Sequence, residues 1–329
     1  METQPLVSIV IPTYNSEKTI AAALDAVYAQ EYPLDKIEVI IIDDFSTDAT
    51  LKKAEEYRRK FPNFKTPRKT SRKGAAASTN QGIAESTGEI VCSIDSDTII
   101  SKNWVKLAVQ KFTDPNVGAV AGLIESANSH SIWARFMGAE LEDRYGRIKG
   151  KSVDHVSTCG TAYRKEALLE VKGFDEDYKY GYDNDASYKL TKKGYKIYLL
   201  GDISCKHHWK ESLLGYLTQQ FNVAYYRLLL IDKYSEKLRG DAISGIKMLI
   251  QVPVTGLAVV IAIFNIKISL LLLLSILLMQ APQTIRVIKR KKDRSFLIFP
   301  FFLLLRNLTW LSASIAYLFK IYYIMPKKL

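Results

Sequence analysis

VSIVIPTYN, Val7 to Asn15, is a nearly continuous apolar run that ends in polar side chains. Such a run is typical of a strand that is buried on both faces, as in a parallel sheet covered by helices. Two further runs of the same kind follow, IEVIIIDDFS (Ile37–Ser46) and EIVCSIDSD (Glu89–Asp97). We therefore predict an α/β fold built on a mostly parallel sheet.

The segments between these runs have helical composition. One helix is expected from Glu17 to Gln30, and a second runs through ATLKKAEEYRRK, with Asp48 as its cap. A short strand is expected over Phe64–Lys69, followed by a helix within KGAAASTNQGIAESTG that ends at Gly88. Alternation of this kind places helices on both faces of the sheet.

Each of the three strands ends in polar groups. These groups are Thr13-Tyr14-Asn15, Asp43-Asp44 and Asp95-Ser96-Asp97. Ligands of open α/β sheets bind beyond the carboxyl ends of the strands, so we expect one polar cleft at this edge.

The pair Asp95 and Asp97 predicts a metal site. Two carboxylates alone would repel a diphosphate, whereas a divalent cation held between them reverses that interaction. Hard oxygen ligands select Mn²⁺ or Mg²⁺. An Asp-x-Asp pair is common in loops, and its position at a strand end is what strengthens this prediction.

Charge is distributed unevenly along the chain. Residues 1–240 carry 34 basic and 32 acidic side chains, whereas residues 241–329 carry 12 basic and 2 acidic ones. The basic excess therefore coincides with the apolar tail, which indicates a membrane rather than a nucleic acid. Cys92, Cys159 and Cys205 are odd in number and widely spaced, so we expect free thiols and no zinc site.

The tail predicts membrane-spanning helices. Two spans are expected over residues 244–263 and 268–285, and the basic stretch RVIKRKKDR, Arg286–Arg294, is expected to face the cytoplasm. Two spans return the chain to the side on which it started, so the N-terminal part is expected to be cytoplasmic too, which agrees with the lack of a signal-peptide pattern at the first residues. Residues 296–323 contain Arg306 and Asn307, and form either a third span with Arg306 facing a partner helix or an interfacial segment.

Four blocks together resemble the inverting family-2 glycosyltransferases. They are VSIVIPTYN, VIIIDDFSTDAT (Val39–Thr50), NQGIAESTGEIVCSIDSDT (Asn80–Thr98) and GFDEDYKYGYDNDASYKL (Gly173–Leu190), and the similarity extends from Pro5 to Arg227. The resemblance implies a GT-A fold, which is Rossmann-like, and a nucleotide-diphospho-sugar donor. It also implies a GT-A catalytic domain over residues 1–235 and a membrane domain with two to three transmembrane helices over residues 236–329.

The resemblance also assigns roles around the cleft. Asp44 matches the aspartate that accepts a hydrogen bond from the base, Asp95 matches a metal and ribose ligand, and Asp97 matches a metal ligand. The other expected nucleotide-pocket residues are Pro12, Tyr14, Glu17 and Asp43. His207 stands five residues before Ser212, a spacing that family members use beside the metal, with His208 as the alternative.

Asp183 is expected to be the catalytic base. Inverting transfer needs a base for the acceptor hydroxyl, and the family usually has Glu-Asp where this chain has Tyr182-Asp183. Asp183 or Asp185 can instead cap the helix that follows.

One other difference from the family pattern concerns a positive charge. The family often has an arginine where this chain has Thr79, and Lys73 is a candidate for the missing charge. Farther along the chain, the resemblance implies that Gln219, Gln220 and Arg227 contact the acceptor or the diphosphate, and a solvated or membrane-surface helix is the alternative for that segment.

The predicted function is membrane-bound inverting transfer of a sugar from a UDP- or GDP-sugar to a hydroxyl of a lipid-linked saccharide or polysaccharide. Transfer to polyprenyl phosphate is the alternative, because an ionised phosphate needs no base. A nucleotidyltransferase is disfavoured because IPTYNSEKT has no glycine. An inactive membrane scaffold stays open because Tyr182 breaks the acidic pair.

Overall fold

The computed structural model describes residues 4–324, with side chains through residue 320. The chain divides into two compact units. The first contains residues up to 127 and residues 145–208, and the second contains residues 128–144 and those from 209 onward. This division falls at His208, upstream of the expected boundary near residue 235, and it assigns one internal helix to the second unit.

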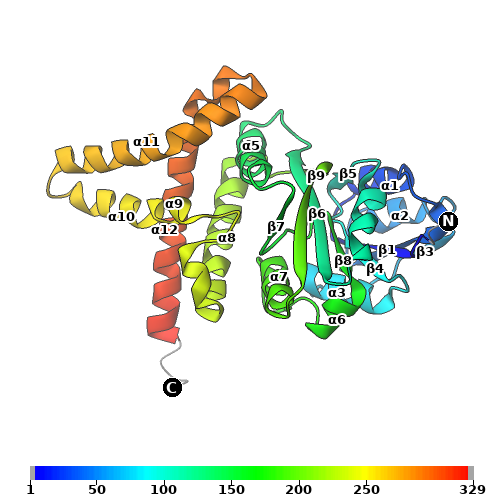
Figure 1. Cartoon of the computed structure of the whole chain (residues 1–329). Coiled ribbons are helices and arrows are strands. Elements are labelled where there is room, and N and C mark those ends of the chain that lie inside the picture. The colour runs from blue at the N-terminus through cyan, green and yellow to red at the C-terminus, as the bar shows by residue number, and fades with distance from the viewer. Residues whose placement is uncertain (1–3, 325–329) are drawn as a thin grey trace. The chain divides into compact units, whose positions relative to one another are not determined.

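The first unit is built on a mixed sheet whose strand order is β3-β2-β1-β4-β8-β6-β9-β5, with β7 paired to β9 (Figure 1). The strands are β1 (Val7–Thr13), β2 (Ile37–Asp43), β3 (Asn63–Lys65), β4 (Ile90–Ser93), β5 (Thr98–Ile100), β6 (Val117–Ser126), β7 (Lys151–Val153), β8 (Thr161–Arg164) and β9 (Lys196–His207). The half formed by β3, β2, β1 and β4 is parallel throughout. The three predicted apolar runs are β1, β2 and β4.

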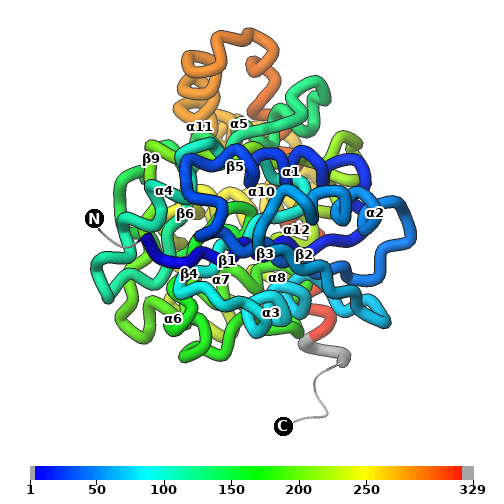
Figure 2. Tube along the Cα trace, turned by 90° about the vertical axis from the view of Figure 1, so that its right-hand side faces the viewer, coloured from blue at the N-terminus to red at the C-terminus, as the bar shows by residue number. Residues whose placement is uncertain are grey.

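Helices cover both faces of this sheet, as predicted. They are α1 (Ile20–Tyr28), α2 (Thr50–Glu55), α3 (Ala75–Glu85), α4 (Trp104–Val109), α6 (Lys165–Glu170) and α7 (Tyr182–Lys192). Figure 2 shows α1 and α2 on one side of the sheet and α3 and α6 on the other. Helix α3 lies close to β1 at Gly82, where an added Cβ would be 2.3 Å from Val10 Cγ1. All three cysteines are free and buried.

The second unit is helical. Its helices are α5 (Ile132–Gly146), α8 (Leu213–Lys233), η3 (Ser235–Arg239), α9 (Ile246–Leu249), α10 (Gln251–Ile261), α11 (Ile266–Lys291), η4 (Arg294–Ile298) and α12 (Phe299–Ile324). The last two residues of α5, after Arg144, belong to the first unit. Helices α8 and α12 run side by side, and α10 and α11 form a hairpin (Figure 1).

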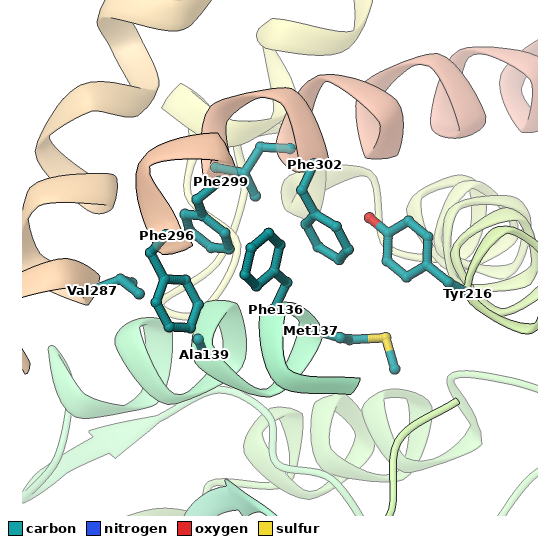
Figure 3. Packing of buried hydrophobic residues seen from close by; sticks show 9 residues of the cluster. Phe136, Met137, Ala139, Tyr216, Val287, Phe296, Phe299 and Phe302 are labelled. Carbon is teal, nitrogen blue, oxygen red and sulfur yellow. The ribbon is translucent and has the colours of Figure 1, made fainter. Parts of the chain in front are cut away.

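Aromatic packing joins α5, α8 and α12. Phe136 of α5 contacts Phe296, Phe299 and Phe302, with 4.8 Å between its ring centroid and that of Phe296 (Figure 3). Tyr216 of α8 packs on Phe302 with ring centroids 4.4 Å apart. Segment 128–144 therefore shares a hydrophobic core with the C-terminal helices.

Ion pairs reinforce the same junction. Arg286 of α11 makes a two-pronged contact with Asp143 of α5, at 3.0 and 2.9 Å. Arg306 is buried in the middle of α12 and pairs with Glu140 of α5. One of the two alternatives for this segment has Arg306 facing a partner helix, and α5 is the helix that it faces.

Two described helices are long and apolar enough to cross a membrane, Ile266–Lys291 and Arg294–Lys320. They correspond to the second and third predicted segments. The first predicted span does not form one long helix, because α9 and α10 together occupy only Ile246–Ile261. Pro253 lacks the N–H that would bond to the carbonyl of Leu249, which explains the break between α9 and α10.

Candidate active site

Asp95, Asp97 and His207 meet at the carboxyl end of β4. The two aspartates lie in the tight turn between β4 and β5, and β5 pairs with β9 so that Thr98 is opposite His207. One ligand atom from each of the three side chains lies within 4.8 Å of the others. Asp97 Oδ1 and His207 Nδ1 are 3.1 Å apart. The strand register thus gathers the three predicted metal ligands.

The environment of this cluster shifts its proton affinities. Burial, and then the neighbouring charge of Asp97, raise the pKa of Asp95 to about 7. Burial disfavours the imidazolium of His207, yet the Asp97 carboxylate prevails and raises the pKa of His207 to about 9. A divalent cation at this place would be held by the same carboxylates and imidazole.

His208 has a different role from His207. Its ring Nδ1 lies 3.0 Å from the backbone carbonyl oxygen of Asp97, and its backbone N–H donates to that oxygen at 3.3 Å. These contacts hold the turn that carries Asp97. His207 is therefore the histidine whose side chain faces the carboxylates.

Asp183 lies in the first turn of α7, near the same cluster, and its charge is among those that raise the pKa of Asp95. Burial raises the pKa of Asp183 itself, although the backbone N–H of Asn184 and the charge of His155 oppose that effect. The Asn184 N–H donates to Asp183 Oδ1 at 2.9 Å. A carboxylate with raised proton affinity near the metal ligands is suited to accept a proton.

The other acidic candidate in α7 is in a structural position. Asp185 is fully buried and pairs with Lys189 one turn later at 2.7 Å. Tyr182 packs edge-on against Phe174, with ring centroids 5.7 Å apart, and burial raises its pKa. Among the residues of this turn, Asp183 is the carboxylate left for chemistry.

Asp43 and Asp44 anchor the basic loop TPRKTSRKG, Thr66–Gly74, to the end of β2. Asp43 is 3.2 Å from Arg68 Nε, and Asp44 accepts hydrogen bonds from the backbone N–H groups of Lys73 and Gly74, both at 2.8 Å. A carboxylate has about four acceptor positions, so Asp44 can still accept a further hydrogen bond from a base.

Of the remaining predicted pocket residues, Tyr14 contacts a basic side chain, whereas Pro12 and Glu17 are held within the fold. Tyr14 follows β1, and the guanidinium of Arg72 lies 3.9 Å from the centroid of its ring. Pro12 is buried within β1, opposite Ile42. Glu17 accepts a hydrogen bond from the backbone N–H of Ala49 at 3.1 Å, so it holds the start of α2 in place.

Asp48 was predicted to cap α2, but the N-cap is Ala49, and Asp48 precedes it. It accepts hydrogen bonds from the backbone N–H groups of Thr50 at 3.0 Å and Glu17 at 3.2 Å. It therefore positions the segment before α2.

Arg72 was not predicted from the sequence as a residue of this site. It belongs to the basic loop, which carries Arg68, Lys69 and Lys73 as well. Four basic residues stand close together before a predicted helix, beside the predicted cleft. This pattern is the sequence signal from which Arg72 could have been predicted. Stacking on Tyr14 places a permanent cation beside the expected nucleotide pocket.

The residues suspected around α3 have other partners. Thr79 is buried, and its hydroxyl donates to the carbonyl of Ala75 at 2.9 Å. Asn80 donates to the carbonyl of Phe174 and accepts from the N–H of the same residue. Asn80 therefore ties α3 to the loop before α7.

Two glutamines suspected as acceptor contacts lie within the helical unit. Gln220 accepts a hydrogen bond from Trp310 Nε1 at 3.0 Å, which commits it to helix packing. Gln219 Oε1 is buried and has no hydrogen-bond partner among the described residues. Arg227 pairs with Asp241 at 2.7 Å.

Comparison with known proteins identifies the family. Residues 8–171 match Glycosyl transferase family 2, and residues 90–325, more than half of the chain, match Glycosyl transferase family group 2.

Curated relatives are similar over large parts of the chain. The chain is 27% identical over 205 residues to glycosyltransferase AglE of Haloferax volcanii, covering 61% of this chain and 66% of that protein. It is 26% identical over 295 residues to a dolichyl N-acetyl-α-D-glucosaminyl phosphate 3-β-D-2,3-diacetamido-2,3-dideoxy-β-D-glucuronosyltransferase of Methanococcus voltae, covering 82% of this chain and 87% of that protein. The match thus spans just under two thirds of the Haloferax protein.

A solved structure supports the fold. The mannosyltransferase PcManGT from Pyrobaculum calidifontis, in complex with GDP-Man and Mn²⁺, superposes with a TM-score of 0.64 at 20% identity, covering 97% of this chain and 88% of that one. The sheet, the strand-end cluster and these matches together show that the chain belongs to the family-2 glycosyltransferases and has the GT-A fold.

Proposed function

We propose that this protein is a membrane-bound inverting glycosyltransferase that moves a sugar from a nucleotide-diphospho-sugar to a hydroxyl of a lipid-linked saccharide or polysaccharide. The observation that carries the proposal is the meeting of Asp95, Asp97 and His207 at the end of β4, with Asp183 beside them. This arrangement supports a cation site and a base near one another at the carboxyl edge of the sheet.

The donor set fits a divalent cation. Two carboxylates suit Mn²⁺ or Mg²⁺, and the imidazole of His207 favours Mn²⁺, because Mg²⁺ takes oxygen ligands almost exclusively. When bound, the cation neutralises the diphosphate that leaves. The residues proposed to hold it are Asp95, Asp97 and His207.

The nucleotide is proposed to lie against Pro12, Tyr14, Asp43 and Asp44, at the ends of β1 and β2. Asp44 is held by two backbone N–H groups of the basic loop, which fixes the orientation of its carboxylate. Arg72 adds a cation beside Tyr14. A UDP- or GDP-sugar is the proposed donor, and GDP-Man is the ligand named for PcManGT.

Asp183 is proposed to take the proton of the acceptor hydroxyl. As the proton moves to its carboxylate, the acceptor oxygen bonds to the anomeric carbon, the bond from that carbon to the phosphate oxygen breaks, and the nucleoside diphosphate leaves. Attack from the opposite face inverts the configuration. The burial that raises the proton affinity of Asp183 also favours this transfer.

The acceptor and the location are proposed on two observations. The Methanococcus relative is named for transfer to a dolichyl-phosphate-linked sugar, which supports a lipid-linked hydroxyl acceptor. The two long apolar helices support insertion in the cell membrane. We place both the catalytic unit and the basic Arg286–Arg294 segment in the cytoplasm, which requires the chain to return between them, and the hairpin of α10 and α11 is proposed to make that return.

Acceptor chemistry separates this proposal from transfer to polyprenyl phosphate. Full-length protein in detergent would be given its donor with either a polyprenyl-linked monosaccharide or polyprenyl phosphate. We expect transfer to the saccharide, and Asp183→Asn should reduce its kcat by roughly a hundredfold or more, as expected for loss of general-base catalysis. Asp177→Asn is the matched control, because Asp177 is exposed in the preceding loop.

Full activity of Asp183→Asn with polyprenyl phosphate would refute the hydroxyl acceptor and favour the phosphate acceptor. Absence of donor binding by the wild-type protein, measured in the same preparation, would refute glycosyl transfer as a whole.

A further inference from the structure

Asp44 is the carboxylate that the proposed function sets against the base of the nucleotide. It directly follows β2, and its side chain is 5% exposed. Two backbone N–H groups bind it, since Lys73 donates to Oδ1 and Gly74 donates to Oδ2, both at 2.8 Å. The direction from which these two donors approach determines which acceptor positions remain for a base.

The two donors belong to consecutive residues, so their nitrogen atoms are at most about 3.6 Å apart. Each carboxylate oxygen has two acceptor positions. The two inner positions lie side by side beyond the end of the carboxylate, whereas the two outer positions point away from each other. Donors this close together can reach both oxygens only through the inner positions. The N–H groups of Lys73 and Gly74 therefore occupy the end of the Asp44 carboxylate.

A cation lies beside one of the two oxygens. Lys69 Nζ is 3.6 Å from Asp44 Oδ1, and the Lys69 side chain is 10% exposed. Because the inner position of Oδ1 already holds the Lys73 N–H, we place Lys69 on the outer side of that oxygen. The outer side of Oδ2 is then the acceptor position that Asp44 retains for a base.

The neighbouring carboxylate, Asp43, is committed to the fold. It is fully buried, accepts from the backbone N–H of Ser46 at 3.2 and 3.3 Å, and pairs with Arg68 at 3.2 Å. The basic loop brings four cationic residues and no acidic one. One of them is Arg72, stacked on Tyr14. The site beside Asp44 is therefore one acceptor among several donors.

Nucleobases differ in what they present to such a site. The pairing edge of uracil has one N–H between two carbonyl oxygens, which complements one acceptor between donors. Guanine has one carbonyl oxygen followed by two donors, N1–H and the N2 amine, which complement two acceptors side by side. A carboxylate with a free end would supply that pair of acceptors, but the backbone of the basic loop occupies this end of Asp44.

We propose that Asp44 and the basic loop select uracil, so that the sugar donor is a UDP-sugar and not a GDP-sugar. This inference rests on the proposed function, in which Asp44 contacts the base. The N3–H of uracil bonds to the remaining acceptor of Asp44, and the cations of the loop complement its carbonyl oxygens. Guanine would leave its N2 amine without an acceptor in a nearly closed site, which is costly.

Nucleotide binding tests the inference without sugar transfer. Isothermal titration calorimetry of the full-length protein in detergent, with Mn²⁺ present throughout, compares UDP, GDP and inosine diphosphate, whose base is guanine without the N2 amine. We expect UDP to bind at least roughly tenfold more tightly than GDP, as expected for one unpaired donor. Inosine diphosphate should also bind more tightly than GDP, because it lacks the donor that has no partner.

Methylated bases and two variants locate the contact. 3-Methyl-UDP has no N3–H and should bind roughly tenfold or more weakly than UDP, whereas 5-methyl-UDP keeps the pairing edge and should bind like UDP. Asp44→Ala should bind UDP and GDP about equally. Asp35→Ala is the matched control, because Asp35 is exposed just before β2, at the other end of that strand, and should keep the preference for UDP.

Three results would overturn the inference alone. They are GDP binding more tightly than both UDP and inosine diphosphate, equal binding of UDP and 3-methyl-UDP, or an unchanged preference for UDP in Asp44→Ala. Absence of binding by every nucleotide in the presence of Mn²⁺ would instead overturn the proposed function, and the inference with it.

Discussion

Asp95, Asp97 and His207 come from distant parts of the sequence, and the register between β5 and β9 brings them together. The sequence predicts the two carboxylates because they follow an apolar strand. Choosing His207 over His208 depended on family spacing, since two adjacent histidines at a strand end look alike in sequence. The stacking of Arg72 on Tyr14 was not predicted, because it depends on the path of the loop between β3 and α3.

Glu38 is a buried carboxylate within β2 that sequence periodicity does not explain. Its carboxylate accepts hydrogen bonds from Ser8 at 2.5 Å, Lys65 at 2.7 Å and the backbone N–H of Thr87 at 2.8 Å. Burial alone would raise the pKa of Glu38, but these donors outweigh it and lower the pKa below its ordinary value. The ionised form therefore links β1, β2, β3 and the segment after α3.

This arrangement predicts a pH-dependent contribution to stability. Because the folded-state pKa of Glu38 is lowered, its contribution is fully present above the unfolded-state pKa and is lost as the pH falls through the folded-state value. Glu38→Gln should lower the free energy of unfolding by about 1–3 kcal/mol at pH 7, and the difference should shrink below about pH 4. Thermal unfolding across pH measures it, with exposed Glu56→Gln as control. A difference that stays constant with pH would contradict the assignment.

At the scale of elements, the parallel half of the sheet follows directly from the apolar runs. The antiparallel strands β5 and β8 do not, because each spans only three or four residues and owes its conformation to its neighbours. The association of α5 with the C-terminal helices was also not predicted. In the sequence the acidic residues of α5 look like those of a solvent-exposed helix face, because their partners Arg286 and Arg306 lie far along the chain.

The Glu140–Arg306 pair joins α5 to α12, and its loss is expected to weaken that junction. Removing one partner of a buried pair leaves the other charge uncompensated. Arg306→Met should lower the free energy of unfolding by about 2–3 kcal/mol, somewhat less than a fully isolated charge would cost, because Arg144 is also 3.7 Å from Glu140.

A double-mutant cycle with Glu140→Gln, followed by thermal unfolding in detergent, isolates the pair. We expect the loss of unfolding free energy in the double variant to be smaller than the sum of the two single losses by about 1 kcal/mol or more. Strict additivity would show that the two side chains do not interact.

At the scale of the whole molecule, the family and the GT-A fold are predictable because several motif blocks occur in order. The membrane segments were predicted less well. Total hydropathy identified the tail, but helix lengths depend on breaks such as the one before Pro253 and on buried polar side chains such as Arg306 and Asn307. Their polarity is compensated by contacts with Glu140 and Gln251 that no local pattern reveals.

The central claim is that the strand-end cluster binds a divalent cation that enables use of a nucleotide-sugar. The most direct test is Mn²⁺-dependent release of nucleoside diphosphate from UDP- and GDP-sugars by the full-length protein, with membrane lipid extract as the acceptor source. Wild type is compared with Asp97→Ala and with the exposed control Asp177→Asn. We predict release with one donor, abolished by chelation, retained in Asp177→Asn and reduced by roughly a hundredfold or more in Asp97→Ala, since the metal supplies several kcal/mol of charge stabilisation. Release by Asp97→Ala at the wild-type rate, or release that persists under chelation, would contradict the claim.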